Sequence, residues 1–85
     1  MISFDYTITG ELGIHARPAG ILIREVKKHK SRVLFFNGKK KAEGIKLFAI
    51  MQLGIKYGST LGVIVEGSDE AETAAAIKQT LETYL

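Results

Sequence analysis

The hydrophobic pattern near the N-terminus changes its period, and this change constrains the fold more than any other feature. Residues 2–8 alternate strictly between apolar and polar side chains, which is typical of a half-buried strand. Apolar residues then recur at i, i+3, i+4 and i+7, the spacing of one helix face: Ala19, Leu22, Ile23 and Val26. We therefore expect a strand followed by a helix that begins near His15 or Ala16 and ends near Lys28.

Turn signals divide the rest of the chain into further short elements. The pair Asn37-Gly38 predicts a two-residue hairpin turn between a strand over 33–36 and a returning strand over 39–42. The three lysines of the returning strand suit an exposed sheet edge. We also expect a short helix over 45–53 that is closed by Gly54, and a strand over 60–66. A last helix should follow Gly67-Ser68-Asp69, because Asp69 and Glu72 resemble a capping box at its start.

The expected element order is β-α-β-β-α-β-α, which favours the α+β class. Because the elements are short and one connection is a tight hairpin, we expect an open sandwich with an antiparallel sheet and helices packed on one face. The 85 residues are enough for one domain, residues 1–85, with a thin core.

Composition excludes several kinds of site. The chain has no cysteine, so disulfides, thiolate metal sites and thiol catalysis are excluded. The N-terminus lacks the pattern of a signal peptide, and no apolar run approaches the roughly 20 residues of a membrane span. We expect a soluble cytoplasmic protein without membrane insertion, and its net charge of +3 favours acidic partners.

The segment Gly13-Ile14-His15-Ala16-Arg17-Pro18-Ala19 places a histidine at the start of the predicted helix. The first N–H groups of a helix lack partners and form its positive end, which disfavours a protonated imidazole and predicts a neutral, nucleophilic His15. The same groups, including the backbone N–H of Ala16, would bind a phosphoryl dianion, and Arg17 adds a planar donor fork. Pro18 fits the first helical turn, where a missing N–H costs nothing.

The motif contains no carboxylate that could act as a base, and the chain has no P-loop glycine pattern and no pair of aspartates suited to Mg²⁺. This indicates a carrier whose partners supply the other catalytic groups, rather than a stand-alone enzyme. We expect no cofactor and no metal.

Residues 13–19 resemble the active-site motif of HPr, the histidine-containing phosphocarrier of the bacterial phosphotransferase system. The resemblance extends over the whole chain and includes the Asn37-Gly38 hairpin and the segment Met51-Gln52-Leu53-Gly54-Ile55. It implies an open-faced sandwich of four antiparallel strands and three helices, in a protein that we expect to be a monomer. It also implies that enzyme I, which draws on phosphoenolpyruvate, phosphorylates His15, that Arg17 stabilises the phosphate, and that EIIA domains of sugar permeases accept the group.

Three positions depart from the family pattern. Lys46 stands where many relatives carry a regulatory serine at the start of the second helix, so we expect serine phosphorylation to be absent. Leu12 replaces a small polar residue, and His29 continues the apolar helix stripe where relatives usually have a large aromatic residue. We expect His29 to be a half-buried or surface histidine without a role in the chemistry.

The second helix is apolar nearly all round. Ile50 and Leu53 are expected to face the sheet, which leaves Leu47, Phe48 and Met51 as a candidate partner surface. The resemblance implies that this surface lies near the His15 end of the molecule. The alternative is that these three side chains simply fill a thin core. Arg17, Arg24 and Lys27 would form a basic rim for acidic partners, although Arg24 and Lys27 also suit an ordinary solvated helix face.

Two other functions fit parts of the sequence. Lys46 and Leu12 are compatible with a regulatory HPr paralogue that acts by protein binding and does not feed sugar transport. A nucleic-acid-binding sheet is the second, but Phe35 and Phe36 lie in an otherwise hydrophobic strand and no stacking motif surrounds them, so we expect no nucleic-acid partner.

Overall fold

The structure is a computed structural model that describes residues 1–85. Its elements follow the expected order: β1 (Ile2–Thr7), α1 (Ala16–Lys27), β2 (Arg32–Asn37), β3 (Lys40–Glu43), α2 (Leu47–Met51), β4 (Thr60–Glu66) and α3 (Glu70–Tyr84). None of the three helices combines the length and the apolar character that a membrane crossing requires.

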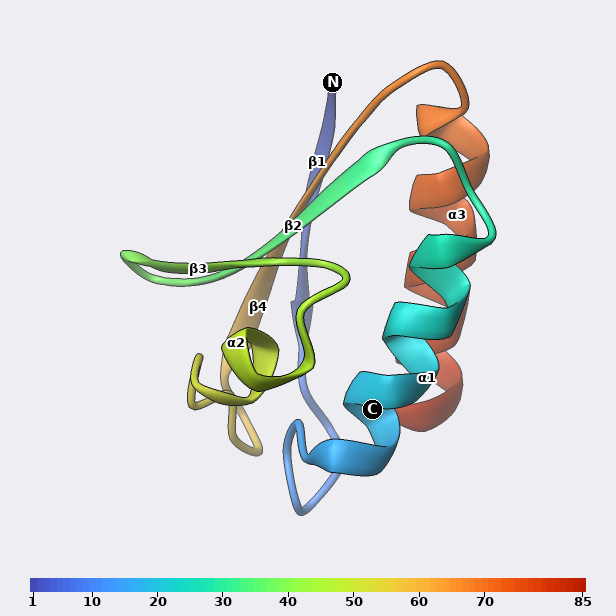
Figure 1. The fold of residues 1–85 in the computed structure, drawn as a ribbon. Helices are drawn as coiled ribbons and strands as arrows, with labels where there is room; N and C mark the ends of the chain where they lie inside the picture. The colour runs from blue at the N-terminus through green and yellow to red at the C-terminus, as the bar shows by residue number, and fades with distance from the viewer.

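The four strands form one antiparallel sheet in the order β1-β4-β2-β3. The helices cover one face of this sheet and leave the other open (Figure 1). α1 packs between its two neighbours, with α3 lying over β1 and β4 and α2 lying beside β3. The predicted α+β open sandwich is therefore confirmed.

The sheet contributes every second residue of its strands to the core. Leu61, Val63 and Val65 of β4 are buried, while the residues between them are only half-buried. The helices supply the facing layer through the stripes expected from the sequence, Ala19, Leu22 and Val26 in α1 and Ala74, Ile77, Leu81 and Leu85 in and just after α3. Burial of these side chains is the main force that holds the two layers together.

The β2–β3 hairpin differs from the expectation by one residue. Asn37 pairs with Lys40 as the last position of β2, so the two-residue loop is Gly38-Lys39 and not Asn37-Gly38. Gly38 has a positive φ of 61° while Lys39 does not, which is the pattern of a type II′ turn. The side chain of Asn37 explains the shift, because its Nδ2 donates a hydrogen bond to the carbonyl oxygen of Leu53 at 2.7 Å and is held in the strand.

The second helix is shorter than the predicted span over 45–53. It covers only Leu47–Met51, with Lys46 as its N-cap residue. The backbone turns out of the helix at Gly54, whose positive φ of 70° suits glycine. Ile50 and Leu53 are buried as expected.

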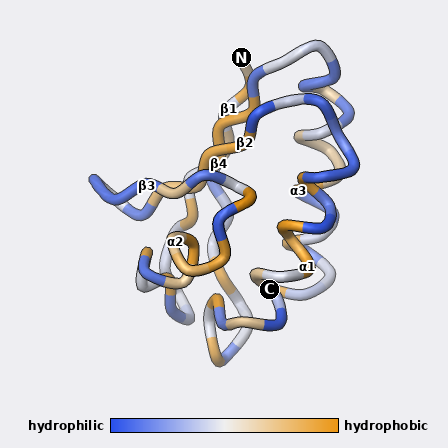
Figure 2. Tube along the Cα trace, in the orientation of Figure 1, coloured by the Kyte–Doolittle hydropathy of each residue, from blue (hydrophilic) through white to orange (hydrophobic).

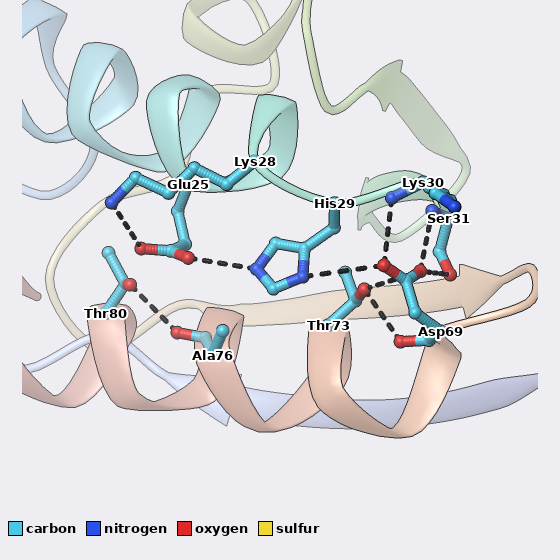
Figure 3. A network of polar contacts seen from close by, with 9 residues as sticks. All are labelled: Glu25, Lys28, His29, Lys30, Ser31, Asp69, Thr73, Ala76 and Thr80. Atoms are coloured by element: carbon cyan, nitrogen blue, oxygen red, sulfur yellow. Dashed lines mark hydrogen bonds and ion pairs between the residues drawn. The ribbon is translucent and has the colours of Figure 1, made fainter.

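Asp69 is the N-cap residue of α3, but the predicted capping box does not form, because no side chain caps the first turn. The carboxylate of Asp69 instead reaches the loop between α1 and β2 (Figure 3). It accepts hydrogen bonds from the backbone N–H of Lys30 at 3.0 Å, from the N–H of Ser31 at 2.9 Å, and from the hydroxyl groups of Ser31 and Thr73. These bonds hold the pKa of Asp69 far below its usual range, the N–H of Lys30 having the largest effect.

His29 lies beside this network and is half-buried, as expected. Its Nε2 is 3.0 Å from a carboxylate oxygen of Glu25, and its Nδ1 is 3.8 Å from a carboxylate oxygen of Asp69 (Figure 3). The hydrogen bond from His29 is the main cause of the lowered pKa of Glu25. His29 thus connects the last turn of α1 to the start of α3.

We predict that Asp69→Asn lowers the midpoint of thermal unfolding at pH 7 by about 5 °C. An amide has one acceptor oxygen where the carboxylate has two, so its NH₂ group would face the N–H groups of the loop. Circular dichroism would measure the midpoint. Glu82→Gln is the matched control, because Glu82 is exposed and makes no hydrogen bond or ion pair through its side chain.

The same variant changes the acid dependence of stability. Because folding lowers the pKa of Asp69, the ionised carboxylate stabilises the folded chain above its unfolded-state pKa of about 3.9, and this contribution is lost as the pH falls towards the folded-state pKa. The midpoint of Asp69→Asn should therefore fall less between pH 5 and about pH 2 than that of the unsubstituted chain. Parallel curves for the two chains would contradict this account.

Candidate functional site

The site begins with the position of His15, which is the N-cap residue of α1. Its backbone is extended, with φ −124° and ψ −176°, and its carbonyl oxygen accepts the first helical hydrogen bond, from the N–H of Ala19 at 3.0 Å. The imidazole makes no capping hydrogen bond and is partly exposed. The sequence placed the start of this helix correctly, and the ring is free for another partner.

Two backbone amides beside His15 are also free. The N–H groups of Ala16 and Arg17 have no hydrogen-bond partner in the chain, and Pro18 has no N–H. The first turn of α1 contains no acidic residue that could occupy these donors. A helix start of this kind favours an anion, because unpaired N–H groups and the positive end of the helix dipole point the same way.

The loop before α1 is held in place at both ends. The N–H groups of Thr9 and Gly10 donate to the carbonyl oxygen of Leu85 at 2.6 and 2.8 Å, and the N–H of Ile14 donates to that of Ile55 at 3.1 Å. Gly13, with a φ of 64°, passes so close to Ile55 that a Cβ would lie 2.4 Å from the same oxygen. Only glycine fits here, and this contact fixes where the next residues, including His15, begin.

A shallow hollow of about 340 Å³ opens beside His15. Its lining comes from the loop before α1 and from the end of α3: Gly10, Glu11, Leu12, Gly13, His15, Tyr84 and Leu85. Sequence reasoning missed Tyr84, because the residue lies on the last turn of α3 and only the packing of α3 against α1 brings it here.

Arg17 is exposed and lines a different hollow, of about 480 Å³, between α1 and α3. It shares this groove with Arg24, and Tyr84 lines both hollows. Arg17, Arg24 and Lys27 form no ion pair with any carboxylate. The structure thus gathers unpaired positive charge along α1, and it places the Arg17 side chain beside Arg24 rather than in the hollow of His15.

The three candidate docking residues of α2 differ in exposure. Phe48 is 75% exposed and Met51 37%, whereas Leu47 is half-buried and packs against the core. Figure 2 shows α2 as a hydrophobic segment and the nearby β2–β3 hairpin tip as hydrophilic. Ile55, just after α2, binds the loop that leads to His15, so this apolar surface lies near the same end of the molecule.

No group of three or more His, Asp or Glu side chains is arranged to hold a metal ion. What the site contains is a free imidazole, two free amides, nearby arginines and exposed apolar side chains. This set is suited to accepting and binding an anionic group and to contact with another protein.

Comparison with known proteins agrees with this chemistry. The family described as "PTS HPr component phosphorylation site" matches residues 2–83. The chain is 39% identical over 83 residues to phosphocarrier protein HPr of Mycoplasma genitalium, covering 96% of this chain and 94% of that protein. It is 32% identical over 81 residues to HPr of Mycoplasma capricolum, covering 95% and 91%.

A solved structure gives the same answer. The crystal structure of HPr-C-His from Thermoanaerobacter tengcongensis superimposes with a TM-score of 0.92 at 29% identity, covering 98% of this chain and 93% of that one. The match to the family model extends over nearly the whole sequence and includes the segment around His15. From the fold, the free imidazole at the start of α1 and these likenesses, we conclude that the chain belongs to the HPr family of phosphocarriers of the phosphotransferase system.

Proposed function

We propose that this chain accepts a phosphoryl group on His15 from enzyme I, which draws on phosphoenolpyruvate, and passes it to EIIA domains of sugar permeases. The protein acts as a cytoplasmic monomer and is not a catalyst on its own. The observation that carries the proposal is the free imidazole of His15 next to the unpaired N–H groups of Ala16 and Arg17.

The transfer is a displacement at phosphorus. A ring nitrogen of His15 attacks, the bond from phosphorus to the donor breaks as the new nitrogen–phosphorus bond forms, and the donor keeps the electron pair. The amides of Ala16 and Arg17 then bind oxygens of the transferred group. The guanidinium of Arg17, which has no carboxylate partner, is free to turn towards the phosphate and to donate two parallel hydrogen bonds.

The step back to an acceptor uses the same geometry. None of the ion pairs of this chain joins a carboxylate to His15, and we expect no residue of the chain to activate water or the leaving group. A partner must therefore contribute the remaining groups, which keeps the phosphoryl group on His15 until an acceptor docks.

We expect His15→Ala to abolish phosphorylation without changing the fold, because the imidazole makes no hydrogen bond. Intact-mass analysis after incubation with enzyme I and phosphoenolpyruvate would show one acid-labile phosphoryl group on the unsubstituted chain and none on the variant. Transfer of that group onward to an EIIA domain would separate the carrier from a regulatory paralogue. A stably phosphorylated His15→Ala chain would show that a residue other than His15 accepts the phosphoryl group.

We further propose that partners dock on Leu47, Phe48 and Met51, with Arg24 and Lys27 at the edge of the contact. Phe48 is 75% exposed, so its apolar surface is available to a partner at little cost to the core. Arg24 and Lys27 lie on α1 without a carboxylate partner, and their positive charge would attract acidic partners and speed their approach.

Phe48→Glu is expected to slow phosphoryl exchange about tenfold or more, because burying a large apolar side chain contributes about 1.5–3 kcal/mol to an interface. The midpoint of thermal unfolding should not change. Phe48→Leu is the matched control and should retain most of the rate. If Phe48→Glu exchanges the phosphoryl group at the normal rate, Phe48 is not part of the interface.

Lys46 is the exposed N-cap residue of α2, the position at which we expected a regulatory serine to be missing. A lysine side chain cannot form a phosphate ester, and its charge is unfavourable at a helix start. Incubation with an ATP-dependent HPr serine kinase should therefore yield no phosphoserine. A stoichiometric product, located by mass spectrometry, would show that another serine has taken over this role.

A further inference from the structure

Leu12 has the largest exposed fraction of the large apolar side chains, 79%. It lies in a tight turn that the N–H of Gly13 closes by donating to the carbonyl oxygen of Gly10 at 3.0 Å. The side chain contributes nothing to the core, since it is absent from the buried cluster and from the residues packed against it. The fold therefore gives no reason for a leucine here, where turns usually carry small polar residues.

The loop nevertheless presents this side chain in a fixed place. Its two ends are held by the carbonyl oxygens of Leu85 and Ile55, as described for the site. Leu12 is thus an exposed apolar group on a well-anchored backbone, and little conformational entropy is lost when a partner covers it.

Leu12 also lines the hollow that contains His15. Tyr84, at the end of α3, is 53% exposed and lines the same hollow. The buried Leu85 also lines it. Gly10 and Gly13 add no side chains, so the apolar part of the lining beside His15 consists of Leu12, Tyr84 and Leu85. Glu11 is the one acidic residue of the lining, and it is exposed.

We propose that Leu12 and Tyr84 form an apolar rim that receives an apolar side chain of the phosphoryl donor, presented next to the donor's own transfer site. The proposal rests on the carrier function of His15. Transfer requires the reacting atoms to approach to about 3–3.5 Å, so a donor that reaches His15 must cover the hollow around it. Whatever covers the hollow removes Leu12 from water, and an apolar side chain gains most from that contact.

The test is the steady-state kinetics of phosphorylation by enzyme I with excess phosphoenolpyruvate. Leu12→Ser should raise the KM for this chain about tenfold with little change in kcat, because it removes apolar contact and leaves the reacting groups in place. Serine suits the turn, so the thermal midpoint should not fall. Tyr84→Ser should act in the same direction.

Two controls separate a rim from a general effect of exposed apolar surface. Leu12→Met keeps an apolar side chain of similar volume and should retain the KM of the unsubstituted chain. Ile45→Ser removes an apolar side chain that is 50% exposed and lies by the C-terminal end of α1, far from His15, so it should leave the KM unchanged.

An unchanged KM in Leu12→Ser, with phosphorylation of His15 intact, overturns the rim and leaves the carrier function standing. A KM that rises equally in Leu12→Ser and Leu12→Met also overturns it, because the apolar character would then be irrelevant. If the unsubstituted chain is not phosphorylated, both the carrier function and the rim are wrong.

Discussion

The position of the functional group depends on one close contact, that of the loop before α1 with the backbone of Ile55. Gly13 passes within a distance that no side chain allows, and the N–H of Ile14 binds the same carbonyl oxygen. This contact ties the start of α1 to the segment just after α2. As a result the free imidazole, the free amides and the apolar surface of α2 belong to one rigid arrangement, although they lie on different parts of the chain.

The parts of the fold that depend on periodicity could be predicted from the sequence. Alternation identified β1 and β4, the i, i+3, i+4, i+7 spacing identified α1, and Pro18 limited the start of that helix to within a residue. These patterns indicate which face of a segment is buried, and they can be recognised from the sequence of that segment alone. The start of α1 matters most for the site, because it makes His15 the N-cap residue of this helix.

Two of the errors, the position of the hairpin loop and the capping box of α3, share a different cause, which is a polar side chain that binds a distant backbone group. Asn37 moved the hairpin loop by one residue because it binds the carbonyl oxygen of Leu53, and Asp69 left its own helix uncapped because it binds the N–H groups of Lys30 and Ser31. A local sequence signal describes what such a residue does with its neighbours. It contains no information about distant partners that the fold brings close to the residue. For the same reason the position of Tyr84 beside the hollow of His15 could not be predicted from the sequence.

The two histidines of the chain show why one of them suits phosphoryl transfer and the other does not. His29 lies between the carboxylates of Glu25 and Asp69, so both ring nitrogens face negative charge, which would repel an incoming phosphoryl group and its donor. His15 has no carboxylate partner, and the nearest backbone groups are unpaired donors at the positive end of a helix. Both residues belong to the α1 segment, one at each end, and the helix dipole favours an anion at the end of His15 only. The direction of α1, rather than the identity of the residue, therefore selects the histidine that can hold a phosphate.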